Sequence, residues 1–554
     1  MRPNLARSSY VALGALALAG LVVVASFLGL FSKDEPLPSF TSQACSLPQT
    51  WLERTQRGFF EARSGQISIL PRTPVYMASG AGGWSHSGPW PYLVDVPLVF
   101  YGPGLIDPRG EVDTPATTAD VAPTLMTLLK GFYRTEGKSL DDVVEFSGTA
   151  LQKDPPRVIV VAVLDGGGWN VLDRWPDDWP NLARFMREGV SFTNATVGSS
   201  PSVTPAVHTT LGTGEFPWTH GITGVPMRDE NGEVVDAFLK GESSRFIQVP
   251  TFAERWDAQQ NQKAKIAMVG YEPWHLGMIG KGAEAPGADK DDAVWLDIDT
   301  NEWITNPDHY RLPSAIVETE GLDEYVDELD AVDGEADRMW RGHEILDDPA
   351  RLEETPAFIR FHTDAMLNMI QEDGYGDDGV TDLVFTNYKQ IDRVGHYFNM
   401  KSEEVHDSLI ETDRQLGEIA DFLDSEFGYG KYVLVVTADH GQQPDAADIG
   451  GYGIDPREVE ADIDAEFGPI TQAVWPTEVF LIEDEMNERG ITVEEVARFL
   501  GDYRLIDNAE EPGKYEGEPG QLEADSRLFE MAIPGPALAG VKCARLRLGQ
   551  EWHG

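Results

Sequence analysis

VIVVAVLDGGGW, at residues 158–169, sets the architecture of this chain. It opens with seven apolar residues, most of them β-branched, which predict a buried strand, and Asp165 follows that strand directly. VLVVTADHG, at residues 433–441, has the same form and ends on Asp439 and His440. In an open α/β sheet the carboxyl ends of parallel strands share one edge, and ligands bind there. The two runs therefore predict a mostly parallel sheet with carboxylates and an imidazole at its ligand-binding edge.

Helix-type and strand-type segments alternate through much of the remaining chain. NLARFMREGVSF at 181–192 reads as a helix that leads into a strand, and the helix-type segment at 355–371 precedes TDLVFTNYK at 381–389. This alternation predicts a three-layer α/β/α sandwich around a mostly parallel, doubly wound sheet. Residues 226–355 are acidic and irregular, and we expect them to form a cap inserted over the active-site edge.

The composition limits the partners of this chain. With 554 residues, 41% of them hydrophobic, it can bury the core of one large domain with insertions. Its 43 basic and 93 acidic residues give a net charge of −50, which argues against binding nucleic acid at the surface. Any site for an anionic phosphate ester must therefore be made locally positive, and metal ions are one way to do that.

The N-terminal residues predict a membrane anchor rather than part of the fold. Two arginines precede an apolar run at 11–31 that is long enough to span a bilayer. We expect an uncleaved signal anchor over 1–35, a stalk over 36–60, and one extracytoplasmic catalytic domain over 61–554. A cleaved signal and a secreted protein form the alternative.

The chain has two cysteines, Cys45 and Cys543. In an exported protein they could form one disulfide, which would tie the region after the anchor to the C-terminus. Two unpaired thiols are equally compatible with the sequence.

Further residues with metal-ligand or nucleophile chemistry follow in a recognisable order. Thr204, in PSVTPAVHTTLGTG, lies 39 residues beyond Asp165. Asp392 and His396 stand in IDRVGH, upstream of the Asp-His-Gly triplet at 439–441. This order resembles the alkaline phosphatase superfamily, and within it the type I phosphodiesterase and nucleotide pyrophosphatase group. The resemblance implies an alkaline phosphatase-like fold in which Thr204 is the nucleophile.

The family also needs a third histidine, which normally lies C-terminal to Asp-His-Gly. After that triplet this chain has only His553. Residues 61–104 instead resemble the family's C-terminal sequence, since His86 precedes a Val-Pro-Leu strand by about ten residues. We infer a circular permutation, which is physically cheap because domain termini often lie close together. The permuted segment would be 61–131, and the catalytic core would be 157–225 and 380–545.

The resemblance implies two divalent ions, which would clamp the attacking and leaving oxygens of an in-line displacement. Three aspartates and three histidines suit zinc and tolerate manganese or another divalent ion. One ion would be held by Asp165, Asp439, His440 and the Thr204 oxygen, and the other by Asp392, His396 and His86. Attack by Thr204 would give a phosphothreonine that water hydrolyses. Ser202 and Thr209 compete as nucleophiles, but their spacing to the downstream Thr-Gly pair fits the family less well.

The sequence departs from the family where the substrate would be bound. Val225 stands where relatives carry an asparagine that donates to a phosphoryl oxygen. Lys281, His275 and Arg228 are the candidate substitutes for binding the substrate. Because a dianionic monoester needs more positive help than a monoanionic diester, the missing donor favours diesters. Trp274 could stack on an aromatic leaving group, although packing within the cap is its simpler role.

We therefore expect a metal-dependent hydrolase of phosphodiester or pyrophosphate bonds, acting on a small-molecule phosphate ester. A phosphomonoesterase with the same mechanism is the alternative within enzymes. A non-catalytic, surface-anchored binding protein with a relict metal site is the alternative from another class.

Overall fold

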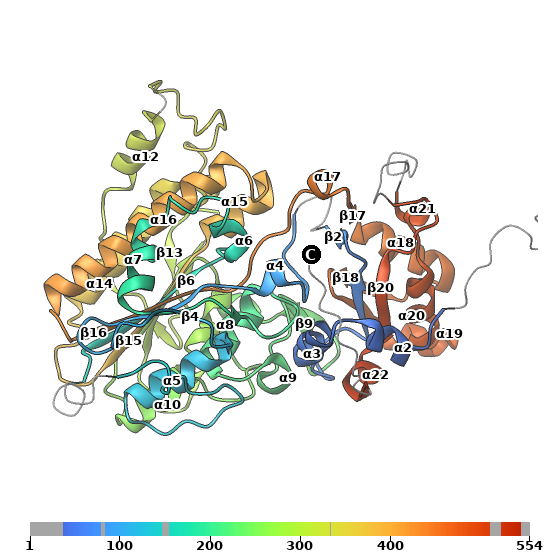
Figure 1. Ribbon diagram of the computed structural model, residues 1–554, viewed down its shortest axis with the longest axis horizontal. Coiled ribbons are helices and arrows are strands. Elements are labelled where there is room, and N and C mark those ends of the chain that lie inside the picture. The colour runs from blue at the N-terminus through green and yellow to red at the C-terminus, as the bar shows by residue number, and fades with distance from the viewer. Residues whose placement is uncertain are drawn as a thin grey trace, which may run out of the picture. The chain divides into compact units, whose positions relative to one another are not determined.

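The structure is a computed structural model (Figure 1). It describes residues 37–78, 84–146, 155–297, 299–332, 334–509 and 522–543. The signal anchor expected over 1–35 and His553 lie outside the described residues. Among the residues that are described, no helix combines the length and the apolar character needed to cross a membrane.

A large sheet of ten strands forms the centre of the fold, as the apolar runs predict. Its strands run in the order β13 (Trp303–Ile304), β12 (Asp291–Leu296), β11 (Ile266–Val269), β15 (Asp382–Tyr388), β6 (Val158–Leu164), β16 (Tyr432–Ala438), β3 (Leu98–Tyr101), β7 (Val190–Phe192) and β4 (Gly110–Val112), with β14 (Tyr310–Arg311) beside β12. The central strand β6 is parallel to both of its neighbours, β15 and β16. The strand β3 is antiparallel to both β16 and β7. The sheet is therefore mostly parallel but not wholly so.

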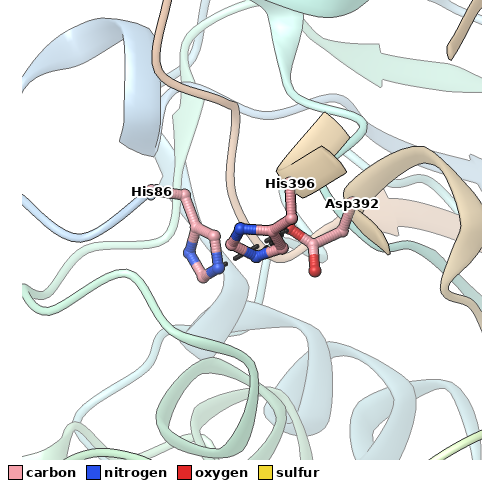
Figure 2. A group of neighbouring side chains, drawn as sticks. All are labelled: His86, Asp392 and His396. Atoms are coloured by element: carbon pink, nitrogen blue, oxygen red, sulfur yellow. Dashed lines mark ion pairs between the residues drawn. The ribbon is translucent and has the colours of Figure 1, made fainter. Parts of the chain in front are cut away.

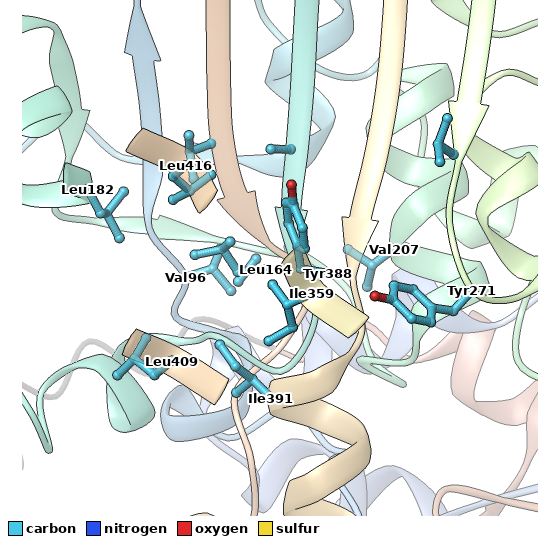
Figure 3. Packing of buried hydrophobic residues seen from close by; sticks show 14 of the residues in the cluster. Val96, Leu164, Leu182, Val207, Tyr271, Ile359, Tyr388, Ile391, Leu409 and Leu416 are labelled. Atoms are coloured by element: carbon cyan, nitrogen blue, oxygen red, sulfur yellow. The ribbon is translucent and has the colours of Figure 1, made fainter. Parts of the chain in front are cut away.

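Both faces of this sheet are covered, which explains why its central strands are apolar throughout. Successive residues of β6 enter opposite layers, since Val160 and Ala162 belong to one buried cluster and Val161 and Val163 to the other. One layer includes helices α7 (Pro180–Glu188), α14 (Pro356–Glu372) and α16 (Glu403–Glu426), and the other includes α5 (Val121–Leu128) and α10 (Phe252–Gln259). Figure 1 shows the helices beside the sheet, and Figure 3 shows Leu164 and Tyr388 packed in the first cluster. The three-layer sandwich is confirmed.

A second, smaller sheet was not expected from the sequence. It is antiparallel, and its order is β18 (Thr471–Trp475), β19 (Glu478–Leu481), β1 (Ile67–Pro71) and β20 (Phe529–Pro534). The strand β1 comes from the N-terminal part of the chain, and its neighbours β19 and β20 come from the C-terminal part. The strand β19 and the following helix α20 (Val493–Asp502) therefore do not continue the large sheet. They bury their apolar residues in a separate core cluster with β1 and β20.

Part of the expected stalk belongs to the compact fold. Residues 40–58 form α2 (Phe40–Ser46) and α3 (Gln49–Gly58), which bury Ala44 and Leu52. The Gln43 side chain accepts a hydrogen bond from the backbone N–H of Ala532 in β20, at 3.0 Å. Cys45 and Cys543 form a disulfide, so one of the two possibilities left open is confirmed.

In the part that the structure describes, the segment 226–355, which we expected to form a cap, contributes to the large sheet. It provides β11, β12, β13 and β14, which extend the large sheet beyond β15. Aromatic residues of this segment pack into the core, and Trp295 is only 4% exposed. The irregular sequence of this segment reflects short strands separated by turns.

Candidate metal centre

The predicted ligands come together at the carboxyl edge of the three central strands. Asp165 follows β6, and Asp439 and His440 follow β16. Asp392 lies in the first turn of α15 (Gln390–Phe398), which begins two residues after β15 ends. Each of these side chains is buried. Adjacent parallel strands thus bring together residues that are more than 200 positions apart in the sequence.

The first cluster contains Asp165, Asp439 and His440, whose ligand atoms all lie within 4.8 Å of one another. The His440 Nε2 atom is 3.4 Å from Asp165 Oδ1 and 3.5 Å from Asp439 Oδ2. The other oxygen of Asp439 accepts a hydrogen bond from the Gly166 N–H at 3.1 Å. Within the described part of the chain, Asp439 Oδ2 and His440 Nε2 are buried without a hydrogen-bond partner.

The second cluster contains His86, Asp392 and His396 (Figure 2). The Nε2 atoms of His86 and His396 lie 3.5 Å and 3.3 Å from Asp392 Oδ1. The other ring nitrogens face backbone carbonyls, since His86 Nδ1 is 2.9 Å from the Ser202 oxygen and His396 Nδ1 is 2.5 Å from the Trp84 oxygen. Asp392 and His396 share one face of α15 because they are four residues apart.

These contacts fit a cation in each cluster. A carbonyl oxygen only accepts hydrogen bonds, so the proton of a neutral His86 sits on Nδ1 and its Nε2 lone pair faces a carboxylate oxygen. Two lone pairs that face each other in a buried site repel unless a cation lies between them. Histidine ligands in metal sites generally donate their second N–H to a carbonyl or carboxylate in this way. Both clusters are therefore candidate metal-binding sites with the donor chemistry of zinc.

The two clusters share a wall. The rings of His86 and His440 stack with a centroid distance of 3.5 Å and an interplanar angle of 4°. His440 Nε2 is also 3.9 Å from Asp392 Oδ1 in the other cluster. His86, which we predicted to lie in the permuted segment, thus contacts one residue of each cluster, His440 and Asp392.

The charges within the site are strongly coupled. Burial alone would raise the pKa of Asp392, but His396, Lys389 and His86 hold that pKa well below its usual range. Burial and the neighbouring His440 lower the pKa of His86, which keeps its imidazole neutral. Burial would also lower the pKa of His440, but the Asp439 carboxylate and its neighbours raise it to about 9. The cluster around His440 thus attracts positive charge.

Thr204 is the first residue of helix α8 (Thr204–Thr213) and is 2% exposed. A helix N-terminus favours negative charge, such as that of an alkoxide or a phosphoryl group. The competing hydroxyls are already engaged, because Ser202 donates to the His86 carbonyl at 2.6 Å and Thr209 donates to the Pro205 carbonyl at 2.7 Å. Among these three hydroxyls, the arrangement favours Thr204 as nucleophile.

Sequence reasoning missed Lys389, whose ammonium lies at the centre of the site. Its Nζ atom is 3.1 Å from Asp165 Oδ2, 2.8 Å from Asp392 Oδ2 and 3.3 Å from Thr204 Oγ1. Burial would lower the pKa of Lys389, but Asp165 and Asp392 raise it above its ordinary value. Its position directly after β15, beside the end of β6, was the available signal.

Of the candidate substrate-binding residues, Lys281 and Arg228 are held by other partners, whereas His275 lies beside the first cluster, since its ligand atom and those of Asp165 and His208 are within 4.8 Å of one another. The Lys281 ammonium donates to the Ile247 carbonyl, and the Arg228 guanidinium pairs with Glu483 at 3.1 Å. His275 is fully buried, and its Nδ1 atom is 3.1 Å from Nδ1 of His208. None of the three candidates is among the described residues that line the cavity in front of Thr204. Each of them is held by partners inside the fold, which spacing in the sequence cannot reveal.

The cavity in front of Thr204 has a volume of about 500 Å³. His86, Asp392, His396 and Lys389 line its inner end, together with Thr204. Its other walls are largely apolar and include Val225, Trp274, Val474, Trp475 and Phe480. Trp274 stays a candidate for stacking, although its indole N–H already donates to Asp236 at 2.8 Å. The second cluster and Thr204 thus open onto a space large enough for an organic group.

Comparison with known proteins identifies the family. The family model for type I phosphodiesterase / nucleotide pyrophosphatase, a class of phosphoric ester hydrolases, matches residues 159–522. That is well over half of the chain, and the chain therefore belongs to this family.

Individual relatives share 24–26% of aligned residues with this chain. The chain is 26% identical over 333 residues to alkaline phosphatase PhoV of Synechococcus elongatus, covering 52% of this chain and 59% of the relative. It is 24% identical over 333 residues to alkaline phosphatase PafA of Elizabethkingia meningoseptica, covering 52% and 60%. A protein named calcium-transporting ATPase from Myroides odoratus is 24% identical over 344 residues, covering 53% and 62%. The chain thus spans about three fifths of the length of these relatives.

The fold is also shared with a solved structure. The crystal structure of wild-type alkaline phosphatase PafA aligns with a TM-score of 0.53 at 21% identity, covering 62% of this chain and 76% of that one. The α/β sheet with its carboxyl-edge site is therefore an alkaline phosphatase-like fold.

Proposed function

We propose that this protein is a metal-dependent hydrolase of phosphodiester or pyrophosphate bonds in small-molecule phosphate esters. The observation that carries the proposal is the pair of clusters with unpartnered ligand atoms, which Lys389 links to Thr204 through contacts with Asp165 and Asp392. Membership in the type I phosphodiesterase family supports the reaction class.

Two divalent ions are part of the proposal. Asp165, Asp439, His440 and the Thr204 oxygen would hold one ion, and His86, Asp392 and His396 would hold the other. When bound, the ions supply Lewis acidity and lower the pKa of a nearby hydroxyl or water. The mixed oxygen and nitrogen donors suit zinc, with manganese as an alternative.

Thr204 carries the covalent step in this mechanism. Its Oγ1 atom forms a bond to phosphorus while the bond to the leaving oxygen breaks, which gives a phosphothreonine. Water then cleaves the phosphothreonine and restores the hydroxyl. The backbone N–H groups at the start of α8 stabilise negative charge on the phosphoryl oxygens throughout.

The cavity favours esters with an organic group on each side of phosphorus. Its walls beyond the site are mostly apolar, and Trp475 is 42% exposed beside it. Val225 lines the cavity and offers no side-chain donor to a dianionic phosphate. A phosphomonoesterase is the second candidate, because two of the matched relatives are named alkaline phosphatases.

The disulfide supports a location outside the reducing cytoplasm, since disulfides persist mainly in oxidising compartments. Export, with or without the expected anchor, is therefore part of the proposal.

A paired assay tests the proposed function on the full-length protein loaded with zinc or manganese. Turnover of bis-p-nitrophenyl phosphate is compared with turnover of p-nitrophenyl phosphate, for wild type, Thr204→Ala and the exposed control Thr193→Ala. Faster diester cleavage that disappears in Thr204→Ala alone is expected. Faster monoester cleavage would transfer the assignment to a phosphomonoesterase. Absence of turnover in a metal-loaded protein would favour the non-catalytic alternative.

A further inference from the structure

The position of Lys389 assigns a role that the metal-type ligands leave open. The site needs a donor for the phosphoryl oxygens, and the side chain of Val225 cannot act as one. Arg393 and Arg457 also line the cavity and, like Lys389, pair with carboxylates, at 3.4 Å from Glu353 and 2.7 Å from Asp455, but no hydrogen bond of the described residues joins either arginine to Thr204. Among the described cations that line the cavity, Lys389 is the one within hydrogen-bond distance of Thr204.

We propose that Lys389 is the phosphoryl-binding cation of this site and donates to an oxygen of the phosphorus that Thr204 attacks. This inference rests on the proposed function. Lys389 would give the site a positively charged contact for the phosphoryl group of the substrate.

The geometry supports contact with the phosphoryl group. Lys389 Nζ is 3.3 Å from Thr204 Oγ1, which is the atom that binds phosphorus in the proposed reaction. Charge-assisted hydrogen bonds from an ammonium to oxygen are about 2.7–2.9 Å long. Oxygens carried by phosphorus on Thr204 therefore fall within reach of the ammonium after a small rotation of the lysine side chain.

In the second cluster, the contacts of Lys389 leave one oxygen of Asp392 to face the histidines. In Asp392 the ammonium uses Oδ2, at 2.8 Å, whereas Oδ1 faces His86 and His396. One carboxylate can thus contact the lysine and serve the second cluster at the same time. Lys389 contacts both oxygens of Asp165 as well, Oδ2 at 3.1 Å and Oδ1 at 3.2 Å, so it connects one carboxylate of each cluster.

The charge of the whole chain makes such a residue useful. With a net charge of −50, the surface repels a phosphate ester. With two divalent ions bound, their charge and that of the ammonium would exceed the charge of the three carboxylates, and the site would become locally positive. The Lys389 ammonium also lies 5.9 Å from the Trp274 ring, which forms the cavity wall beside it.

The test measures binding of inorganic phosphate to the zinc-loaded, full-length protein by calorimetry, with metal content determined in parallel. The variants are Lys389→Met, Lys389→Arg and the control Lys401→Met, whose ammonium pairs with Asp448 outside the cavity. We expect Lys389→Met to weaken phosphate binding about 100-fold, the size of the effect when one preorganised donor is removed. Lys389→Arg should recover part of the affinity, Lys401→Met should match wild type, and the metal content should stay constant.

Two results would overturn the inference. One is unchanged phosphate affinity in a fully metal-loaded Lys389→Met protein. The other is loss of metal from both Lys389 variants with phosphate affinity falling in proportion, which would make the lysine a structural counter-charge. Should Lys389→Met fail to fold, Lys389→Arg decides alone, because an altered donor should weaken phosphate binding while the metal content holds. Phosphate binding needs no turnover, so a failure of the proposed reaction in the Thr204→Ala assay is a separate outcome.

Discussion

Replacement of His86 by alanine tests the part of the site that lies farthest from its partners in the sequence. The His86 Nε2 atom lies 3.5 Å from Asp392 Oδ1, and its ring stacks on His440 at 3.5 Å. His86→Ala removes one of three protein ligands of the second cluster and one wall of the first. Loss of a group that only supports a ligand costs about 10–100-fold in metal affinity. Loss of a ligand itself should lower the metal affinity by at least about 100-fold, which corresponds to about 2.8 kcal/mol.

The assay is the metal content of dialysed protein by mass spectrometry, together with kcat/KM for bis-p-nitrophenyl phosphate. His86→Ala and His396→Ala should lose metal and activity to the same extent, because they hold the same ion. His343→Ala is the matched control, since its imidazole pairs with Glu404 outside the site. The reasoning is refuted if His86→Ala is silent while His553→Ala abolishes activity.

Three further predictions follow from the site and from the fold. Dialysis against a chelator should abolish turnover, and zinc or manganese should restore it; turnover that survives chelation contradicts the proposed site. Burial raises the pKa of Glu478 to about 7, although the hydrogen bond from the Gly65 N–H opposes this shift. The contribution of Glu478 to stability is therefore present below about pH 4.5 and is lost as pH rises through 7. Urea unfolding should therefore find Glu478→Gln gaining about 3 kcal/mol on wild type between pH 4.5 and pH 8, and an equal difference at both pH values contradicts this. Replacing Cys45 and Cys543 by serine opens a loop that the disulfide closes across 498 residues. The chain-entropy model predicts a loss of stability of up to about 6 kcal/mol, and an unchanged Tm would contradict that contribution.

The central strands and most of the site could be read from the sequence. The apolar runs at 158–164 and 432–438 are buried on both faces, and that burial leaves a continuous apolar signal. Asp165 and Asp439 then fall at the carboxyl edge by chain direction alone. The placement of His86 depended on the family resemblance, and the circular permutation behind it stays a prediction.

Other features left no readable signal. The small sheet pairs β1 with β19 and β20 across more than 400 residues, and no local pattern specifies such a partner. The partners of Arg228 and Lys281 are set by tertiary packing, so spacing alone made them look available for substrate. Lys389 was overlooked because a lysine is no metal ligand, although it directly follows a strand that ends at the site.

The most direct test of the account is to locate the covalent intermediate. Zinc-loaded protein is mixed with bis-p-nitrophenyl phosphate, quenched in acid, digested and mapped by mass spectrometry. The account predicts a p-nitrophenyl phosphate group bound to Thr204 in the digested peptide, and no such group in Thr204→Ala. Modification at Ser202 or Thr209, or full turnover by Thr204→Ala without any modified peptide, would contradict it.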